Sequence, residues 1–97
     1  MNDINNKPTI RRVDALRQME LREDENGKRI YYAIQFFDKN GNCIYFSRAY
    51  TCGLRCDMKK NRMRGIQQVD AAGNKINHIV PVSIDYLREF NHQRIVL

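Results

Sequence analysis

Three short turn signals divide the chain and limit what it can fold into. They lie at residues 25–28, 38–42 and 70–74, and each contains an adjacent Asn and Gly. Asn and Gly tolerate the positive φ angles of tight turns, and for 25–28 we predict a type I′ hairpin turn. Frequent turn signals between short apolar segments are typical of all-β domains. The chain is therefore predicted to be mainly β.

The segment between the first two turns is the clearest strand. Residues 29–37 carry apolar side chains on both faces, with Gln35 as the polar exception. A strand that is apolar on both faces is usually central in its sheet. With further strands over 15–23 and 43–50, we predict a three-stranded antiparallel meander over residues 15–50.

The start of the chain gives weaker signals. Residues 1–8 are predicted to be a flexible tail, because polar residues dominate and Pro8 disfavours helix at the residue before it. Residues 9–14 fit either a helix capped by Thr9 or an extended lead-in. The remainder, 9–97, is short enough to form a single small β domain.

The second half of the chain is predicted to add shorter strands. Residues 62–69 and 76–84 are the candidates. Pro81 places the second at a sheet edge or breaks it, because proline cannot donate a ladder hydrogen bond. Ser83 is expected to cap a short helical turn, and residues 94–97 to form the last strand.

These elements predict a small five- to six-stranded antiparallel barrel or bent sheet. Residues 51–61 break the strand pattern and are interpreted as a loop between its two halves. The helical turn near the C-terminus resembles that of SH3-like barrels, an analogy of fold that implies no function.

The positive charge of the chain is concentrated in one stretch. The net charge is +6, and residues 47–65 hold six basic side chains against one acid, a net charge of +5. Residues 1–46 carry a net charge of +1 and residues 66–97 a net charge of zero. A local field of this kind attracts polyanions. The alternative is a solvated loop whose charges only aid solubility.

Nucleic acid is the polyanion that this stretch suits best. Basic side chains neutralise phosphates and release counterions, and exposed aromatic rings beside them stack on bases. Tyr31 and Tyr45 are further rings for such a surface, although core packing competes for every aromatic side chain. The predicted binding residues are Arg48, Arg55, Lys59, Lys60, Arg62, Arg64 and Tyr50.

Cysteine and histidine supply no defensible metal site or catalytic signature. The chain has three cysteines, which is an odd number, and it starts with polar residues rather than an apolar export signal. Both features predict reduced thiols rather than disulfides. Cys52 and Cys56 are spaced more loosely than the paired ligands of structural zinc. Cys43 and His78 are interpreted as packed strand residues. With no P-loop, dinucleotide motif or nucleophile–base pair, we predict no enzyme activity, no metal and no cofactor.

The sequence thus predicts a non-enzymatic nucleic-acid-binding domain that contacts phosphates through residues 47–65. The alternative is a protein-interaction or self-associating accessory module. In that case an exposed strand edge pairs with a partner or forms a homodimer, and the basic segment meets an acidic protein surface. No apolar run approaches the roughly 20 residues that cross a bilayer, so we expect a cytoplasmic protein without a membrane partner.

Overall fold

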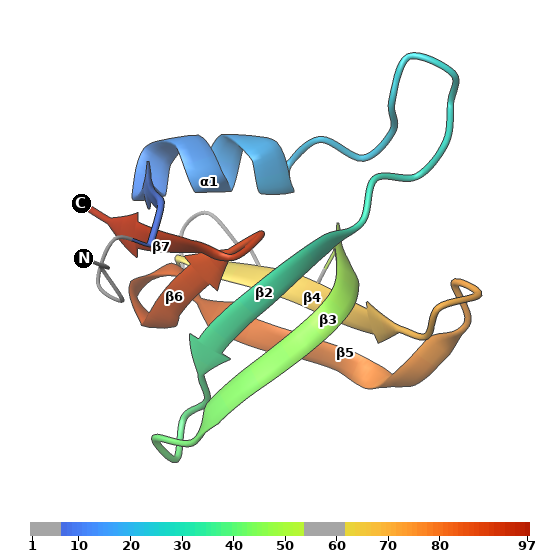
Figure 1. Ribbon diagram of the computed structural model, residues 1–97. Coiled ribbons are helices and arrows are strands. Elements are labelled where there is room, and N and C mark those ends of the chain that lie inside the picture. The colour runs from blue at the N-terminus through green and yellow to red at the C-terminus, as the bar shows by residue number, and fades with distance from the viewer. Residues whose placement is uncertain (1–6, 54–61) are drawn as a thin grey trace.

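Strands dominate the computed structural model, which describes residues 7–53 and 62–97 (Figure 1). The predicted mainly β class is therefore confirmed. The chain order is β1 (Thr9–Arg11), α1 (Arg12–Met19), β2 (Tyr32–Phe37), β3 (Cys43–Cys52), β4 (Met63–Val69), β5 (Lys75–Ser83), a 3₁₀ turn (Ile84–Tyr86), β6 (Leu87–Phe90) and β7 (Gln93–Val96).

The strands form one seven-stranded sheet in the order β1-β7-β6-β2-β3-β4-β5. All neighbours are antiparallel except β1 and β7, which run parallel. The prediction of a small antiparallel barrel or bent sheet with five or six strands is therefore correct only in part: the described strands form one small sheet, but it has seven strands, one parallel pair and no closure into a barrel. The two edges of the described sheet, β1 and β5, offer few groups for a closing ladder, because β1 has three residues and β5 contains Pro81.

Residues 12–19 form a helix where a strand over 15–23 was predicted. Ala15 and Met19 lie one turn apart on α1, and both are fully buried against the sheet. The ambiguous stretch 9–14 divides into the extended β1 and the start of this helix. The first strand of the predicted meander is therefore absent. Of the hairpin predicted around the turn at 25–28, a single bridge pair between Glu23 and Arg29 is present.

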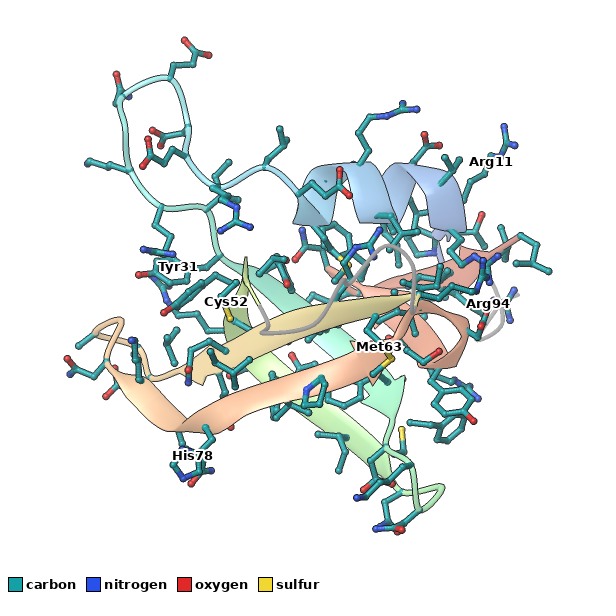
Figure 2. The ribbon with its side chains drawn as sticks, turned by 180° about the vertical axis from the view of Figure 1, so that it is seen from behind. Arg11, Tyr31, Cys52, Met63, His78 and Arg94 are labelled. Carbon is teal, nitrogen blue, oxygen red and sulfur yellow. The ribbon has the colours of Figure 1, made fainter. Side chains whose placement is uncertain are left out.

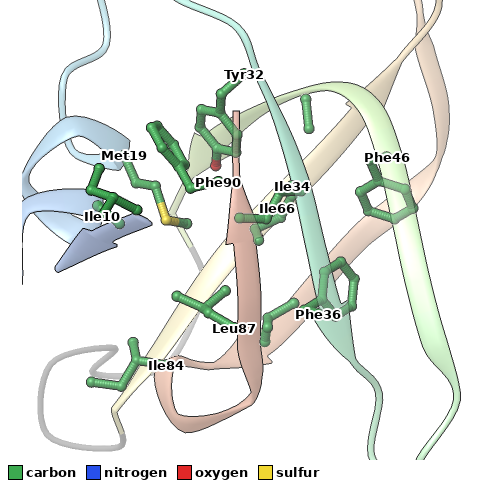
Figure 3. Close-up of a cluster of buried hydrophobic side chains, with 13 residues drawn as sticks. Ile10, Met19, Tyr32, Ile34, Phe36, Phe46, Ile66, Ile84, Leu87 and Phe90 are labelled. Atoms are coloured by element: carbon green, nitrogen blue, oxygen red, sulfur yellow. The ribbon is translucent and has the colours of Figure 1, made fainter. Parts of the chain in front are cut away.

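The central strand is β2, the fourth of the seven, as its two apolar faces predicted. It pairs with β3 in the predicted hairpin and with β6 on its other side. Tyr32, Ile34 and Phe36 point from β2 into the core, where Figure 3 shows them with Met19 of α1 and Phe90 of β6. The helix and the core thus lie on one face of the sheet, and Tyr31, on the opposite parity, faces away from them.

The three predicted turns are present, and they share one geometry. Each begins with an Asp whose Oδ1 accepts backbone hydrogen bonds of 2.8 to 2.9 Å from the residues two and four positions later. Only the glycine three positions after the Asp has a positive φ. The type I′ prediction for 25–28 is therefore wrong, because Asn26 stays out of the left-handed region. The three turns start at Asp24, Asp38 and Asp70.

The second half follows the predicted order in part, because β4, β5, the helical turn and β7 are present but β6 (Leu87–Phe90) was not predicted. β5 is an edge strand, and the Ser83 Oγ accepts a hydrogen bond from the Asp85 N–H at the start of the 3₁₀ turn. Residues 77–79 bulge opposite Gln67 of β4, between the pairs Ile66–Val80 and Gln68–Ile76, so His78 lies within the bulge and outside the regular pairing. His78 is consequently exposed rather than packed, and Cys43 is exposed as well, so both packing predictions are wrong.

Candidate nucleic-acid interface

The structure divides the predicted binding residues into separate groups. Arg55, Lys59 and Lys60 lie outside the described residues, as does most of the predicted loop over 51–61. Arg48 and Tyr50 lie on β3, whereas Arg62 and Arg64 lie at the start of β4. The described members of the basic stretch therefore do not form one continuous surface.

Arg62 is engaged in a structural ion pair. Its Nη2 donates to Asp85 Oδ1 at 2.8 Å and its Nε to Asp85 Oδ2 at 3.3 Å. These hydrogen bonds hold the pKa of the Asp85 carboxyl below its usual range, and Arg12 adds a third contact at 3.1 Å. Because the Nε–Nη2 edge of its guanidinium is matched to a carboxylate, Arg62 has less of its charge to offer a phosphate.

Arg64 lies on the core face of the sheet. Its side chain is only 11% exposed, its Nη1 donates to the Met63 carbonyl at 2.8 Å, and its Nη2 lies 3.5 Å from a carboxylate oxygen of Glu20. Arg64 shares the parity of the buried Ile66, so it points toward the end of α1. It therefore faces away from Arg48 and Tyr50.

Arg48 and Tyr50 belong to a stack of alternating arginine and tyrosine side chains. The Arg48 guanidinium lies 4.1 Å from the centre of the Tyr31 ring, and the Arg29 guanidinium lies 4.1 Å from the centre of the Tyr50 ring. The two rings meet edge to face, with centroids 6.0 Å apart. We name Arg29, Tyr50, Tyr31 and Arg48 the arginine–tyrosine stack.

The fold places this stack on the sheet face opposite the helix. Tyr31 precedes β2 on its outward parity, and Tyr50 points outward from β3 beside Gln67 of β4. A bulge in β3 inserts an extra residue between Phe46 and Ala49, and this extra length directs Arg48 onto Tyr31. Figure 2 shows Tyr31 near the junction of the sheet with the long loop that precedes β2.

The Arg48 side chain is partly buried beneath the surface of the stack. Its Nε is buried and has no hydrogen-bond partner among the described residues. A buried donor left without a partner costs about 1–3 kcal/mol, more when the group is charged. The Arg48 side chain is therefore held at this position by its contact with the Tyr31 ring and not by a hydrogen bond at Nε.

Further positive charge surrounds the stack. Burial raises the pKa of the Cys52 thiol. The positive charges of Arg22, Lys75 and Arg29 lower this pKa in part, because they stabilise the thiolate. These three cations therefore lie within electrostatic reach of Cys52, two residues after Tyr50. The acids of the preceding loop sit at residues 23–25, near the tip that projects from the sheet (Figure 1).

A shallow hollow adjoins the Arg48 end of the stack. Its volume is about 260 Å³, and it lies where β2, β3 and the turn between β6 and β7 meet. The lining residues are Tyr31, Tyr32, Ala33, Ser47, Arg48, Asn91 and His92.

Other kinds of site find little support in the described ranges. No three His, Cys, Asp or Glu side chains among them gather as metal ligands would. No helix within them is long and apolar enough to cross a bilayer.

Several members of the interface were not predicted from the sequence. Arg29, Arg22 and Lys75 lie outside the basic stretch, and nothing local distinguishes them from solvated side chains. Tyr31 was considered as a stacking ring. The alternation of residues 29–37 was the signal that placed Tyr31 and Tyr32 on opposite faces of the strand. Asn91 and His92 carried a turn signal that was not recognised.

Comparison of the chain with protein-family models, with curated proteins and with solved structures found no match. Its function therefore has to be argued from the geometry of the interface itself.

Proposed function

We propose that this chain is a non-enzymatic nucleic-acid-binding domain whose binding surface is the arginine–tyrosine stack. The observation that carries the proposal is the alternation of two guanidinium groups and two aromatic rings on the sheet face away from the helix. Both group types are the ones that stack on unpaired bases, and the arginines also neutralise phosphates.

The geometry favours a single strand over a duplex. Bases in a duplex are stacked on one another, so flat side chains on a sheet reach them only where the strands are separated. Two further cations, Arg22 and Lys75, add positive charge near Cys52, two residues after Tyr50. Arg55, Lys59 and Lys60 remain predicted phosphate contacts.

Fluorescence anisotropy with labelled single-stranded and duplex oligonucleotides tests the proposal. We expect tighter binding of the single strand and a steep loss of affinity with added salt. The variant Arg29→Gln/Arg48→Gln should bind more weakly, and its slope of log K against log salt should fall by roughly 1.4, about 0.7 for each lost phosphate contact.

The matched control is Arg11→Gln/Arg94→Gln, which removes the same charge from β1 and β7. Figure 2 shows Arg11 and Arg94 at the end of the molecule away from Tyr31. The control should retain the affinity of the wild type. Equal losses in both double variants would reduce the proposal to unspecific charge attraction, and no binding by the wild type at low salt would refute it.

The free edge of β5 favours a second candidate function, self-association of the chain. Among the described strands β5 pairs only with β4, and an apolar pocket of about 440 Å³ beside it is lined in part by Val80 and Val82. Exposed edges of this kind pair readily with a second copy. Light scattering over a concentration series would reveal a dimer that persists in high salt, and Ile79→Lys should return it to a monomer.

A further inference from the structure

We infer that the hollow beside Arg48 holds a phosphate group of the bound strand. The inference rests on the proposed function and adds the chemical group that one end of the arginine–tyrosine stack recognises. The stacking rings would then hold bases, while the hollow fixes the backbone next to them.

The lining of the hollow favours an anion. The Arg48 guanidinium, the Ser47 hydroxyl and the His92 ring all have N–H or O–H groups to donate. None of the described residues in the lining carries a carboxylate. Phosphate oxygens only accept hydrogen bonds, whereas base edges present donors as well as acceptors, so this set of donors matches a phosphate better.

Arg48 is oriented in advance for such a contact. Its guanidinium lies over the Tyr31 ring at 4.1 Å, and its Nε is buried, which leaves the terminal nitrogens as the ends that meet a ligand. A planar guanidinium fixed in this way offers two parallel donors to a phosphate. Ser47 precedes it in the same bulge of β3, so both side chains share one local backbone distortion.

Asn91 fixes the opposite rim of the hollow. Its N–H donates to the Ala33 carbonyl at 2.8 Å, and the Ala33 N–H donates to Asn91 Oδ1 at 2.9 Å. This pair of hydrogen bonds ties the turn between β6 and β7 to the central strand. His92, the next residue, is therefore positioned by the sheet rather than by a free loop.

His92 occupies a backbone position that suits glycine. Phe90 pairs with Gln93, and the two residues between them have φ values of 49° at Asn91 and 65° at His92. A two-residue turn with both φ values positive is a type I′ turn, which prefers Asn followed by Gly. His92 is exposed, and its ring lies 6.3 Å from the Tyr45 ring, measured between centroids, so the larger side chain packs at the surface and not in the core. Backbone strain of this kind concentrates at binding sites.

The variant His92→Gly separates binding from folding. Glycine relaxes the turn, so we expect a melting temperature equal to or above that of the wild type. Loss of one donor should weaken the binding of a single-stranded oligonucleotide by about fivefold. Ser47→Ala should have a similar effect through the lost hydroxyl. His78→Ala, which removes an exposed histidine from β5, is the matched control and should leave the affinity unchanged.

A titration with inorganic phosphate tests the hollow without any strand. Backbone NMR shifts confined to Ser47, Arg48, Asn91 and His92 would support the inference, and shifts spread over all exposed arginines would overturn it. Oligonucleotide affinity unchanged in both His92→Gly and Ser47→Ala would also overturn it while leaving the proposed function intact. If the wild type bound no oligonucleotide, the proposed function would fail, and the phosphate titration alone would show whether the hollow binds phosphate.

Discussion

The hydrogen bond between Tyr32 and Thr51 should behave as a coupled pair in the core. The two hydroxyl oxygens lie 2.6 Å apart between β2 and β3, and the residues are 4% and 6% exposed. In Tyr32→Phe the Thr51 hydroxyl stays buried without this partner, and in Thr51→Val the Tyr32 hydroxyl does. Each single change should therefore lower the free energy of unfolding by about 1–3 kcal/mol.

The double variant Tyr32→Phe/Thr51→Val should be much more stable than the sum of its parts. It removes the Tyr32 hydroxyl and replaces the Thr51 hydroxyl by a methyl group, so neither member of the pair is left buried and unpaired. Urea unfolding of the four proteins gives the coupling energy, which we expect to be about 1–3 kcal/mol. Strictly additive losses would refute the reasoning. Tyr86→Phe, at a 48% exposed residue, is the control and should change stability by less than about 0.5 kcal/mol.

The same pair predicts how stability changes at alkaline pH. Burial raises the pKa of the Tyr32 hydroxyl well above its ordinary value of about 10, so the folded protein holds this proton more tightly than the unfolded chain does. The stabilisation is fully present below about pH 10, and it falls by about 1.4 kcal/mol per pH unit as the unfolded chain ionises above that value. Tyr32→Phe should remove this part of the pH dependence.

Two further perturbations test the turns. Gly73→Ala should destabilise the protein by about 1–2 kcal/mol because φ is 87°, and it should also displace Tyr31, whose hydroxyl lies 3.1 Å from the added Cβ. Gly41→Ala has a φ of 83° and open space around the added Cβ. It should therefore destabilise the protein in the same way without any change in oligonucleotide affinity. Backbone hydrogen bonds hold the pKa values of the Asp38 and Asp70 carboxyls below their ordinary range. The stabilisation of the fold by these two carboxylates is therefore present above about pH 4 and is lost on acidification below it. Acid unfolding that is unchanged in Asp38→Ala/Asp70→Ala would contradict this.

The sequence predicted those elements whose signals are local. The two-faced apolar pattern of residues 29–37 identified the central strand, and Pro81 identified the edge strand. Only the start of helix α1 was among the alternatives for residues 9–14, and its remainder was predicted to be a strand, because eight residues are too few to form a stable helix without tertiary contacts. Its two fully buried residues, Ala15 and Met19, depend on a sheet that forms from later parts of the chain.

Part of the arginine–tyrosine stack lies in the predicted basic stretch, and the reason that the rest was not predicted is geometric. Arg48 and Tyr50 were identified from the basic stretch, because charge density along the chain is visible in the sequence. Arg29 is placed against Tyr50 by the path of the loop before β2, which has no sequence signature. The turn at Asn91 and His92 was hidden because its second residue is not the glycine that marks a type I′ turn.

The charge of residues 47–65 is divided by the sheet because alternation sends neighbouring side chains to opposite faces. Arg64 forms an ion pair with Glu20 near the end of α1, whereas Arg48 lies with Arg29 in the arginine–tyrosine stack on the other face. A positive field therefore forms on the open face from residues that are distant in sequence. Net charge along the chain predicted a polyanionic partner, and the stacking of arginine on tyrosine supports the proposal that this partner is an unpaired strand.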